Sequence, residues 1–320
     1  MSTLNGVLLD LATIDQDDLD LSSLDRVCGH WQHHAYTEPA DTRERLSHAQ
    51  IAVTNKVALD RQTLAAASEL RLVCIAATGT NNVDLEAARE LGIAVTNVAR
   101  YATPAVVQHV FALILALTTR LPEYQRAVSA GAWQRHDRFC LMDYPIRELA
   151  GRTLGIVGFG ELGQAVARVA EAFGLQVLIA QRPGGPPRED RLPLDELLPQ
   201  VDVLTLHCPL TDATRGLIGA RELGLMRRDA LLINTARGGI VDEQALAEAL
   251  RRGTLGGAGI DVLSTEPPRG GNPLLAPDIP NLIVTPHIAW ASREARQRVV
   301  EEIAANIEAF LAGKDRNRVV

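Results

Sequence analysis

The sequence lacks the features that mark secreted, membrane and nucleic-acid-binding proteins. It has four cysteines, which stand far apart without CxxC spacing, so no disulfide framework is predicted and reduced thiols in a cytoplasm are expected. No run of Lys and Arg could follow a phosphate backbone, and the formal net charge is −7. These absences argue against nucleic acid as the main partner.

No targeting or membrane-spanning segment is predicted either. The N-terminal stretch has no positive region and turns acidic where a signal peptide would need small residues. The most apolar stretch, 106–117, is too short to span a bilayer and contains Gln108 and His109. We therefore expect a soluble, cytoplasmic protein without a membrane partner.

The chain does have enough apolar sequence for two domains. Its 320 residues are 47% apolar, which suffices for two ordinary hydrophobic cores. Segments typical of strands alternate with segments typical of helices, and such βα repeats form parallel sheets. We expect strands at 7–11, 51–54, 72–76, 93–95, 203–206, 231–234, 259–262 and 283–285, and helices near 41–49, 60–69, 84–91, 103–119, 242–252 and 292–311.

Residues 153–182 form a short unit with the signature of a dinucleotide site. An apolar strand, LGIV, leads into GFGELG, which opens an amphipathic helix that is followed by a second apolar strand, QVLIA. The first glycine suits a tight turn, the second lets backbone approach a pyrophosphate, and the third allows close packing of helix on strand. The residues expected to border the cofactor here are Gly158, Gly160, Glu161, Leu162 and Gly163.

The end of the second strand in this unit favours NADPH over NADH. A site for NAD carries Asp or Glu about 20 residues after the first glycine, where the acid binds the ribose 2′-hydroxyl. Here Gln181 and Arg182 stand at that place, and Arg188 is nearby. Neutral Gln tolerates a 2′-phosphate and a guanidinium binds it, so NADP is the expected cofactor, with NAD possible. The alternative is that both arginines are solvated cations of a Pro/Gly-rich loop.

Three chemically distinctive side chains follow predicted strands of the second half. Arg237 comes after LLINTA, Glu266 after GAGIDVL and His287 after LIVTP. Singly, each could be an ordinary loop residue, but ligands of open α/β sheets bind beyond the carboxyl ends of the strands. Reduction of a keto acid needs such a set, because histidine can deliver the proton, a carboxylate can orient the histidine, and arginine can clamp the substrate carboxylate.

The chain resembles the D-isomer-specific 2-hydroxyacid dehydrogenases over essentially its whole length. Successive blocks match that family in order: ATGTNNVDLEAARELGIAVTNV, GIVGFGELG, LHCPLTDATRGLI, LLINTARGGIVDEQAL, GGAGIDVLSTEP and TPHIA. Within the family the chain is most similar to glycerate dehydrogenases and glyoxylate/hydroxypyruvate reductases. The resemblance implies NAD(P)H-dependent reduction of a small 2-keto acid, hydroxypyruvate or glyoxylate, to D-glycerate or glycolate.

The resemblance also implies roles for individual residues. Arg237, Glu266 and His287 form the catalytic set, and backbone amides around Thr78 and Gly79 hold the substrate carboxylate together with Arg237. No metal site is implied. The further residues implied at the cofactor are Cys208, Pro209, Thr235, Ala236 and Asp261, of which the last takes the nicotinamide carboxamide.

The implied fold has two Rossmann-like or flavodoxin-like parallel-sheet α/β domains. A cofactor domain of residues 99–287 is inserted into a substrate-binding domain formed by 1–98 and 288–320. Family members are typically homodimers joined through the region that is 103–149 here. Phe139 or Met142 is then expected to reach the active site of the partner, and a bulky Trp290 near the nicotinamide is expected to favour small substrates.

Several histidines have simpler interpretations. His30, His33 and His34 resemble a metal cluster only superficially, because no Cys or carboxylate ligands accompany them at a recognised spacing, so we expect exposed loop histidines. His109 lies in an apolar helix and is expected to be a core histidine with a hydrogen-bond partner.

Two other functions stay open at this stage. The same fold and catalytic set could serve a longer 2-keto acid or a keto sugar acid. The fold also serves redox-sensing corepressor-type binding proteins, although the sequence has no acidic or disordered recruitment tail.

Overall fold

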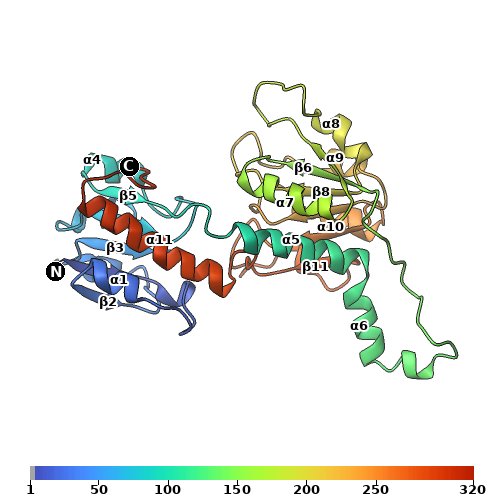
Figure 1. The fold of residues 1–320 in the computed structure, drawn as a ribbon, viewed down its shortest axis with the longest axis horizontal. Helices are drawn as coiled ribbons and strands as arrows, with labels where there is room; N and C mark the ends of the chain where they lie inside the picture. Colours follow the sequence, from blue (N-terminus) through green and yellow to red (C-terminus); the bar gives the residue numbers. More distant parts are fainter. Residues whose placement is uncertain (1–3) are drawn as a thin grey trace. The chain divides into compact units, whose positions relative to one another are not determined.

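The computed structural model describes residues 4–320 and divides into two compact units. One unit extends to Ala102 and resumes at Trp290–Val320, and the other is Thr103–Ala289. The second unit is therefore inserted into the chain of the first, so the blue and red ends of the chain meet in one unit (Figure 1). Each unit contains one parallel sheet, which confirms the predicted fold class.

The first unit is built on a five-stranded sheet with strand order β2-β1-β3-β4-β5. Its inner strands are buried on both faces, which explains why Ile51–Thr54 and Leu72–Ile75 are almost continuously apolar in sequence. The elements of this unit are β1 (Asn5–Leu8), α1 (Ser22–Val27), β2 (His30–His33), α2 (Thr42–Leu46), β3 (Ile51–Thr54), α3 (Arg61–Ala66), β4 (Leu72–Ile75), α4 (Leu85–Glu90), β5 (Ala94–Thr96) and α11 (Arg293–Leu311).

The C-terminal helix α11 completes the first unit. It packs on α1 and β4 and buries an apolar stripe that includes Val299, Ile303 and Ile307. The Ser292 hydroxyl caps its first turn by accepting the amide of Ala295 at 3.2 Å, which begins the helix where the sequence predicts.

The second unit is built on a six-stranded sheet with strand order β11-β10-β9-β8-β6-β7. Among the strands predicted from the sequence, 203–206 and 231–234 coincide with β8 and β9. The elements are α5 (Thr103–Thr118), α6 (Leu121–Ser129), β6 (Thr153–Val157), α7 (Glu161–Ala172), β7 (Gln176–Ile179), α8 (Leu194–Leu197), β8 (Val203–Leu206), α9 (Ala220–Leu225), β9 (Leu231–Asn234), α10 (Glu243–Arg251), β10 (Gly257–Ile260) and β11 (Leu282–Val284).

Helices cover both faces of this sheet. Ala258 and Ile260 of β10 belong to a core that also holds buried side chains of α8, α9 and α10. Gly259 between them faces the opposite side, where a Cβ would lie 2.9 Å from the Cβ of Leu113 in α5. Helix α5 also packs beside α7 (Figure 1), so the long apolar helix is a largely buried component of the second unit.

No single helix among residues 4–320 is long and apolar enough to cross a membrane. Helices α5 and α6 meet the length and composition test only when they are taken together, and they are bent by 60° at the break between them.

Two predicted features are wrong in detail. His30 and His33 lie in the edge strand β2 rather than in a loop, and His34 follows it directly; this strand escaped detection because most of its side chains are polar and exposed. The strand predicted at 259–262 is Gly257–Ile260, so it begins and ends two residues earlier than expected. Asp261, directly after it, binds the turn that follows β11 with its side chain.

Candidate active site

The inserted sheet has its switch in strand order between β6 and β8, which is where open α/β sheets bind ligands. Gly158, immediately after β6, has φ +96°, and a Cβ there would lie 2.6 Å from the amide nitrogen of Cys208. Only glycine permits both this conformation and this approach. The turn after β6 therefore lies against the backbone that follows β8.

The other two glycines of the predicted fingerprint have different surroundings. A Cβ at Gly163 would lie 2.3 Å from the carbonyl oxygen of Gly158, so this glycine lets α7 pack on the turn. A Cβ at Gly160 would meet no atom within 4 Å in the described part of the chain. Glu161, the first residue of α7, accepts a bond from the Thr103 hydroxyl at 2.6 Å. Gly160 is therefore the glycine of the turn that has free space beside it for a ligand.

The residues after β8 and β9 fit a bound dinucleotide. Cys208 and Thr235 are buried, and burial raises the pKa of the Cys208 thiol. The Thr235 hydroxyl is withdrawn from solvent and has no hydrogen-bond partner among residues 4–320. Pro209 and Ala236, which the resemblance also implies at the cofactor, directly follow Cys208 and Thr235. A buried hydroxyl without a partner in the described part of the chain, just after the end of β9, is a group whose hydrogen bonding a polar cofactor would satisfy.

The end of β7 gives the three residues of the predicted 2′-phosphate site different roles. Gln181 closes the following loop, because its side chain binds the Arg188 backbone at 2.8 and 3.0 Å and the Arg191 carbonyl at 3.1 Å. Arg188 is paired with Asp190 at 2.9 Å. Arg182 is exposed, its stem lies against Gly185, and it has no ion-pair partner within the described residues.

His287 and Glu266, which are 21 positions apart in sequence, are brought together. His287 Nδ1 lies 2.7 Å from Glu266 Oε2, and the other carboxylate oxygen accepts the Leu263 amide at 2.9 Å. Both side chains are partly exposed. A carboxylate bonded to one ring nitrogen orients the imidazole and leaves the other ring nitrogen for the reaction.

The turn that carries His287 is held by Asp261. This buried carboxylate accepts the amides of Ile288 and Ala289, each at 2.9 Å, and the hydroxyl of Thr285 at 2.5 Å. The His287 amide donates to the Asp261 carbonyl at 2.7 Å. A bond to the nicotinamide carboxamide, the role implied for Asp261, would be added to these.

Arg237 lies on a loop that is fixed by two neighbours. The buried side chain of Asn234 accepts the Ala236 amide and donates to the Arg237 carbonyl, each at 3.0 Å. A Cβ at Gly238 would lie 1.9 Å from the Leu263 carbonyl oxygen, so this loop contacts the segment that leads to Glu266. Sequence reasoning missed Asn234 and Thr285. Each is a polar residue at the end of an apolar strand, and that pattern could have pointed to them.

Thr78 and Gly79 follow β4 in the first unit. The Thr78 hydroxyl donates to the Val98 carbonyl at 2.9 Å, and the Asn97 side chain donates to the Thr78 carbonyl at 2.8 Å. Their turn is therefore held by the segment after β5, at the carboxyl edge of the first sheet.

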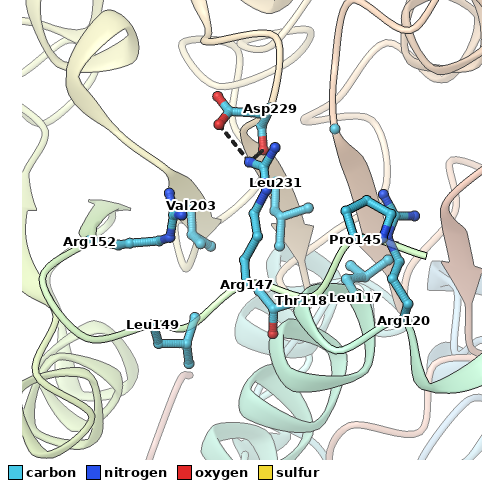
Figure 2. A pocket seen from close by; sticks show the side chains of 11 residues that line it. Leu117, Thr118, Arg120, Pro145, Arg147, Leu149, Arg152, Val203, Asp229 and Leu231 are labelled. Atoms are coloured by element: carbon cyan, nitrogen blue, oxygen red, sulfur yellow. Dashed lines mark hydrogen bonds and ion pairs between the residues drawn. The ribbon is translucent and has the colours of Figure 1, made fainter. Parts of the chain in front are cut away.

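A cavity at the opposite edge of the inserted sheet contains none of the predicted site residues (Figure 2). It lies beside the first residues of β8 and β9, and two of its cations are paired: Arg147 with Asp229 at 2.5 Å and Arg152 with Asp202 at 3.0 Å. No group of His, Cys, Asp and Glu within residues 4–320 could hold a metal ion.

Comparison with known proteins identifies the arrangement. Residues 111–289 match the family model described as D-isomer specific 2-hydroxyacid dehydrogenase, NAD binding domain. A glycerate dehydrogenase of Methylorubrum extorquens is 47% identical over 94% of this chain and 97% of its own. A hydroxypyruvate reductase of Blautia hydrogenotrophica is 37% identical over 98% of both chains.

Solved structures agree in fold. A crystal structure of a protein from Thermus thermophilus has a TM-score of 0.87 and 36% identity, covering 99% of this chain and 100% of that one. An acyclic imino acid reductase in complex with NADPH and D-Arg has a TM-score of 0.83 and 26% identity, with coverage of 99% and 100%.

The contrast between Gly160 and Gly163 gives a first prediction. Gly160→Ala should leave the thermal midpoint unchanged, because its Cβ meets open space, yet raise the dinucleotide Kd at least about 10-fold by obstructing close backbone approach. Gly163→Ala should lower the midpoint by several degrees, since its Cβ would meet backbone. Fluorescence titration and thermal unfolding check both, and equal behaviour of the two variants would contradict the assignment.

Acid sensitivity of the fold gives a second prediction. Burial lowers the pKa of His207 to about 4, whereas unfolded histidine has a pKa of about 6.5. Between these pH values His207 is protonated in the unfolded chain and neutral in the folded chain. The free energy of unfolding therefore falls as the pH is lowered from about 6.5 to about 4, by at most about 3 kcal/mol. Urea midpoints at pH 7 and pH 5 test this. His207→Asn should flatten the dependence, and an unchanged dependence would refute the explanation.

Proposed function

Because this chain belongs to the D-isomer specific 2-hydroxyacid dehydrogenases, we propose that it reduces hydroxypyruvate and glyoxylate to D-glycerate and glycolate. The observation that carries the proposal is the 2.7 Å pair of His287 and Glu266 beyond the strand ends of a dinucleotide-binding fold. The names of the relatives, glycerate dehydrogenase and hydroxypyruvate reductase, support the same substrates.

In the proposed mechanism His287 is the general acid. Glu266 binds Nδ1, so Nε2 is the nitrogen that gives its proton to the oxygen of the substrate carbonyl as that carbonyl becomes a hydroxyl. The nicotinamide cofactor supplies the hydride when it is bound. In the reverse direction the same nitrogen takes the proton back, with Glu266 stabilising the charged ring.

Substrate is held by groups from both parts of the chain. Arg237 binds the substrate carboxylate and stabilises charge on the carbonyl oxygen, together with amides around Thr78 and Gly79. In this proposal 1–98 and 288–320 form the substrate-binding domain, and 99–287 form the cofactor domain.

NADPH is the proposed cofactor. The support is the exposed guanidinium of Arg182 at the end of β7, which has no ion-pair partner among residues 4–320, and the absence of an acid at the 2′ position. Gln181 contributes by closing the loop rather than by its charge, since its side chain is bonded to the backbone at 188 and 191. The likeness to a reductase solved with NADPH is consistent with this preference.

A homodimer in the cytoplasm is the proposed state of the enzyme. Its support is a set of exposed apolar side chains between α6 and β6, notably Trp133 at 52%, Phe139 at 89% and Met142 at 71% exposure. Apolar side chains gathered on one segment mark an interaction surface. In a homodimer Phe139 or Met142 would reach the active site of the second copy.

Longer 2-keto acids, keto sugar acids and a corepressor-type binding role are the alternatives. The expectation that Trp290 lies near the nicotinamide favours the smaller substrates, because a large ring there would leave less room. Substrate profiling of the purified protein separates these functions, and tight cofactor binding without turnover of any 2-keto acid would favour the binding protein.

The catalytic assignment predicts unequal effects of two histidines that each lie beside a glutamate. His287→Ala should lower kcat about 10²- to 10⁴-fold, because the proton donor is lost. His48→Ala, which removes the partner of Glu69 at 3.4 Å on the surface of the first unit, is the matched control and should be near wild type. Arg237→Ala should lower kcat and raise KM together. Steady-state kinetics decide, and near-normal turnover of His287→Ala would overturn the mechanism.

The cofactor assignment predicts unequal effects of two arginines. Wild type should show higher kcat/KM with NADPH than with NADH. Arg182→Ala should reduce the NADPH value about 10-fold, the effect of losing one charged contact, and leave the NADH value unchanged. Arg188→Ala is the matched control and should leave both kcat/KM values near wild type, because Arg188 is already paired with Asp190. A wild-type preference for NADH would refute the proposal.

A further inference from the structure

The long helix α5 contributes one ionisable side chain, His109, that contacts the residues holding the His287 turn. His109 Nε2 lies 3.0 Å from the Thr285 hydroxyl oxygen and 3.5 Å from Asp261 Oδ1. The expectation of a core histidine with a partner is confirmed, since the ring is mostly buried and bonded. The partner, however, belongs to the segment that carries the proposed general acid.

The direction of these hydrogen bonds follows from a count of protons. The Thr285 hydroxyl has one proton, and it donates this proton to Asp261 Oδ1 at 2.5 Å. It can therefore only accept from His109, which must carry its proton on Nε2. The chain of bonds runs from His109 through Thr285 to Asp261, whose carboxylate is almost fully buried.

Asp261 in turn fixes the backbone of His287 and of the two residues that follow it. It accepts the amides of Ile288 and Ala289 on its carboxylate and the amide of His287 on its carbonyl. His287 has φ +56°, a left-handed conformation that non-glycine residues hold only when their surroundings impose it. The bonds to Asp261 supply that constraint.

We propose that His109 is a positioning residue for the reaction: its Nε2–H holds Thr285 and thereby Asp261 in the orientation that keeps His287 in its left-handed turn. The inference rests on the proposed role of His287 as general acid. Without the donor from His109, Thr285 is free to rotate, Asp261 loses one fixed partner, and the imidazole is presented to substrate in more than one orientation. The chemical step then slows while substrate binding is retained.

The experiment compares variants that remove or keep each hydrogen-bonding group. His109→Leu and Thr285→Val should each lower kcat about 10-fold with the substrate KM changed less than about twofold, the pattern of a group that matters in the transition state. His109→Gln keeps a side-chain N–H donor and Thr285→Ser keeps the hydroxyl, so both should recover most of the lost kcat. The double variant His109→Leu/Thr285→Val should be no slower than the slower single variant, because both remove one chain of bonds.

Thr118→Val is the matched control, because Thr118 is a buried threonine at the end of α5. Within residues 4–320 its hydroxyl bonds only to carbonyls of that helix. Thermal unfolding of every variant shows whether activity is lost through unfolding. The inference is overturned if His109→Leu turns over normally, if Thr118→Val loses as much kcat, if His109→Gln does not recover activity, or if the two losses add in the double variant.

A second readout does not depend on turnover. In ¹⁵N-histidine-labelled protein, His109 should show the tautomer protonated on Nε2, and the ring signals of His287 should shift in His109→Leu. If wild type reduces no 2-keto acid, the proposed function fails while this shift still tests the coupling. If wild type is active and the His287 signals are unmoved in His109→Leu, only the positioning role fails.

Discussion

The candidate active site depends on one buried carboxylate. Asp261 accepts hydrogen bonds from the residues on both sides of His287, and these bonds hold that histidine in a left-handed conformation. A charge removed from water is tolerated only when several donors surround it, and here the donors are the turn itself and the Thr285 hydroxyl. The same hydrogen bonds thus offset the free-energy cost of burying the carboxylate and hold the turn in one conformation.

Close backbone contacts at three glycines position the other loops of the candidate site. Gly158, Gly163 and Gly238 each stand where a Cβ would meet main-chain atoms of a neighbouring segment. The first two join the turn after β6 to α7 and to the end of β8, and the third joins the Arg237 loop to the segment before Glu266. The glycine-rich turn and the loops of Arg237, Glu266 and His287 therefore lie at the same carboxyl edge of the inserted sheet.

Much of this arrangement was predictable because it is encoded locally. Continuous apolar runs marked the buried strands β3, β8 and β9, and the glycine spacing marked the turn after β6. The edge strand β2 was missed because its residues are mostly polar and exposed. Asn234 and Thr285 were missed because each looks like an ordinary strand residue until the loop that it binds is known.

The sequence by itself determined the parallel-sheet α/β class, the dinucleotide fingerprint and the placing of Arg237, Glu266 and His287 after strands, since these follow from periodicity and spacing along a few residues. The insertion of one domain into the other was implied by the family resemblance. The pairing of Glu266 with His287 was already an expectation from the sequence, and the structure places the two side chains 2.7 Å apart. Only the tertiary structure decided that Gln181 closes a loop and that His109 reaches Thr285 across 176 positions. Such pairings depend on how strands and helices pack in three dimensions, and distance along the chain does not encode that.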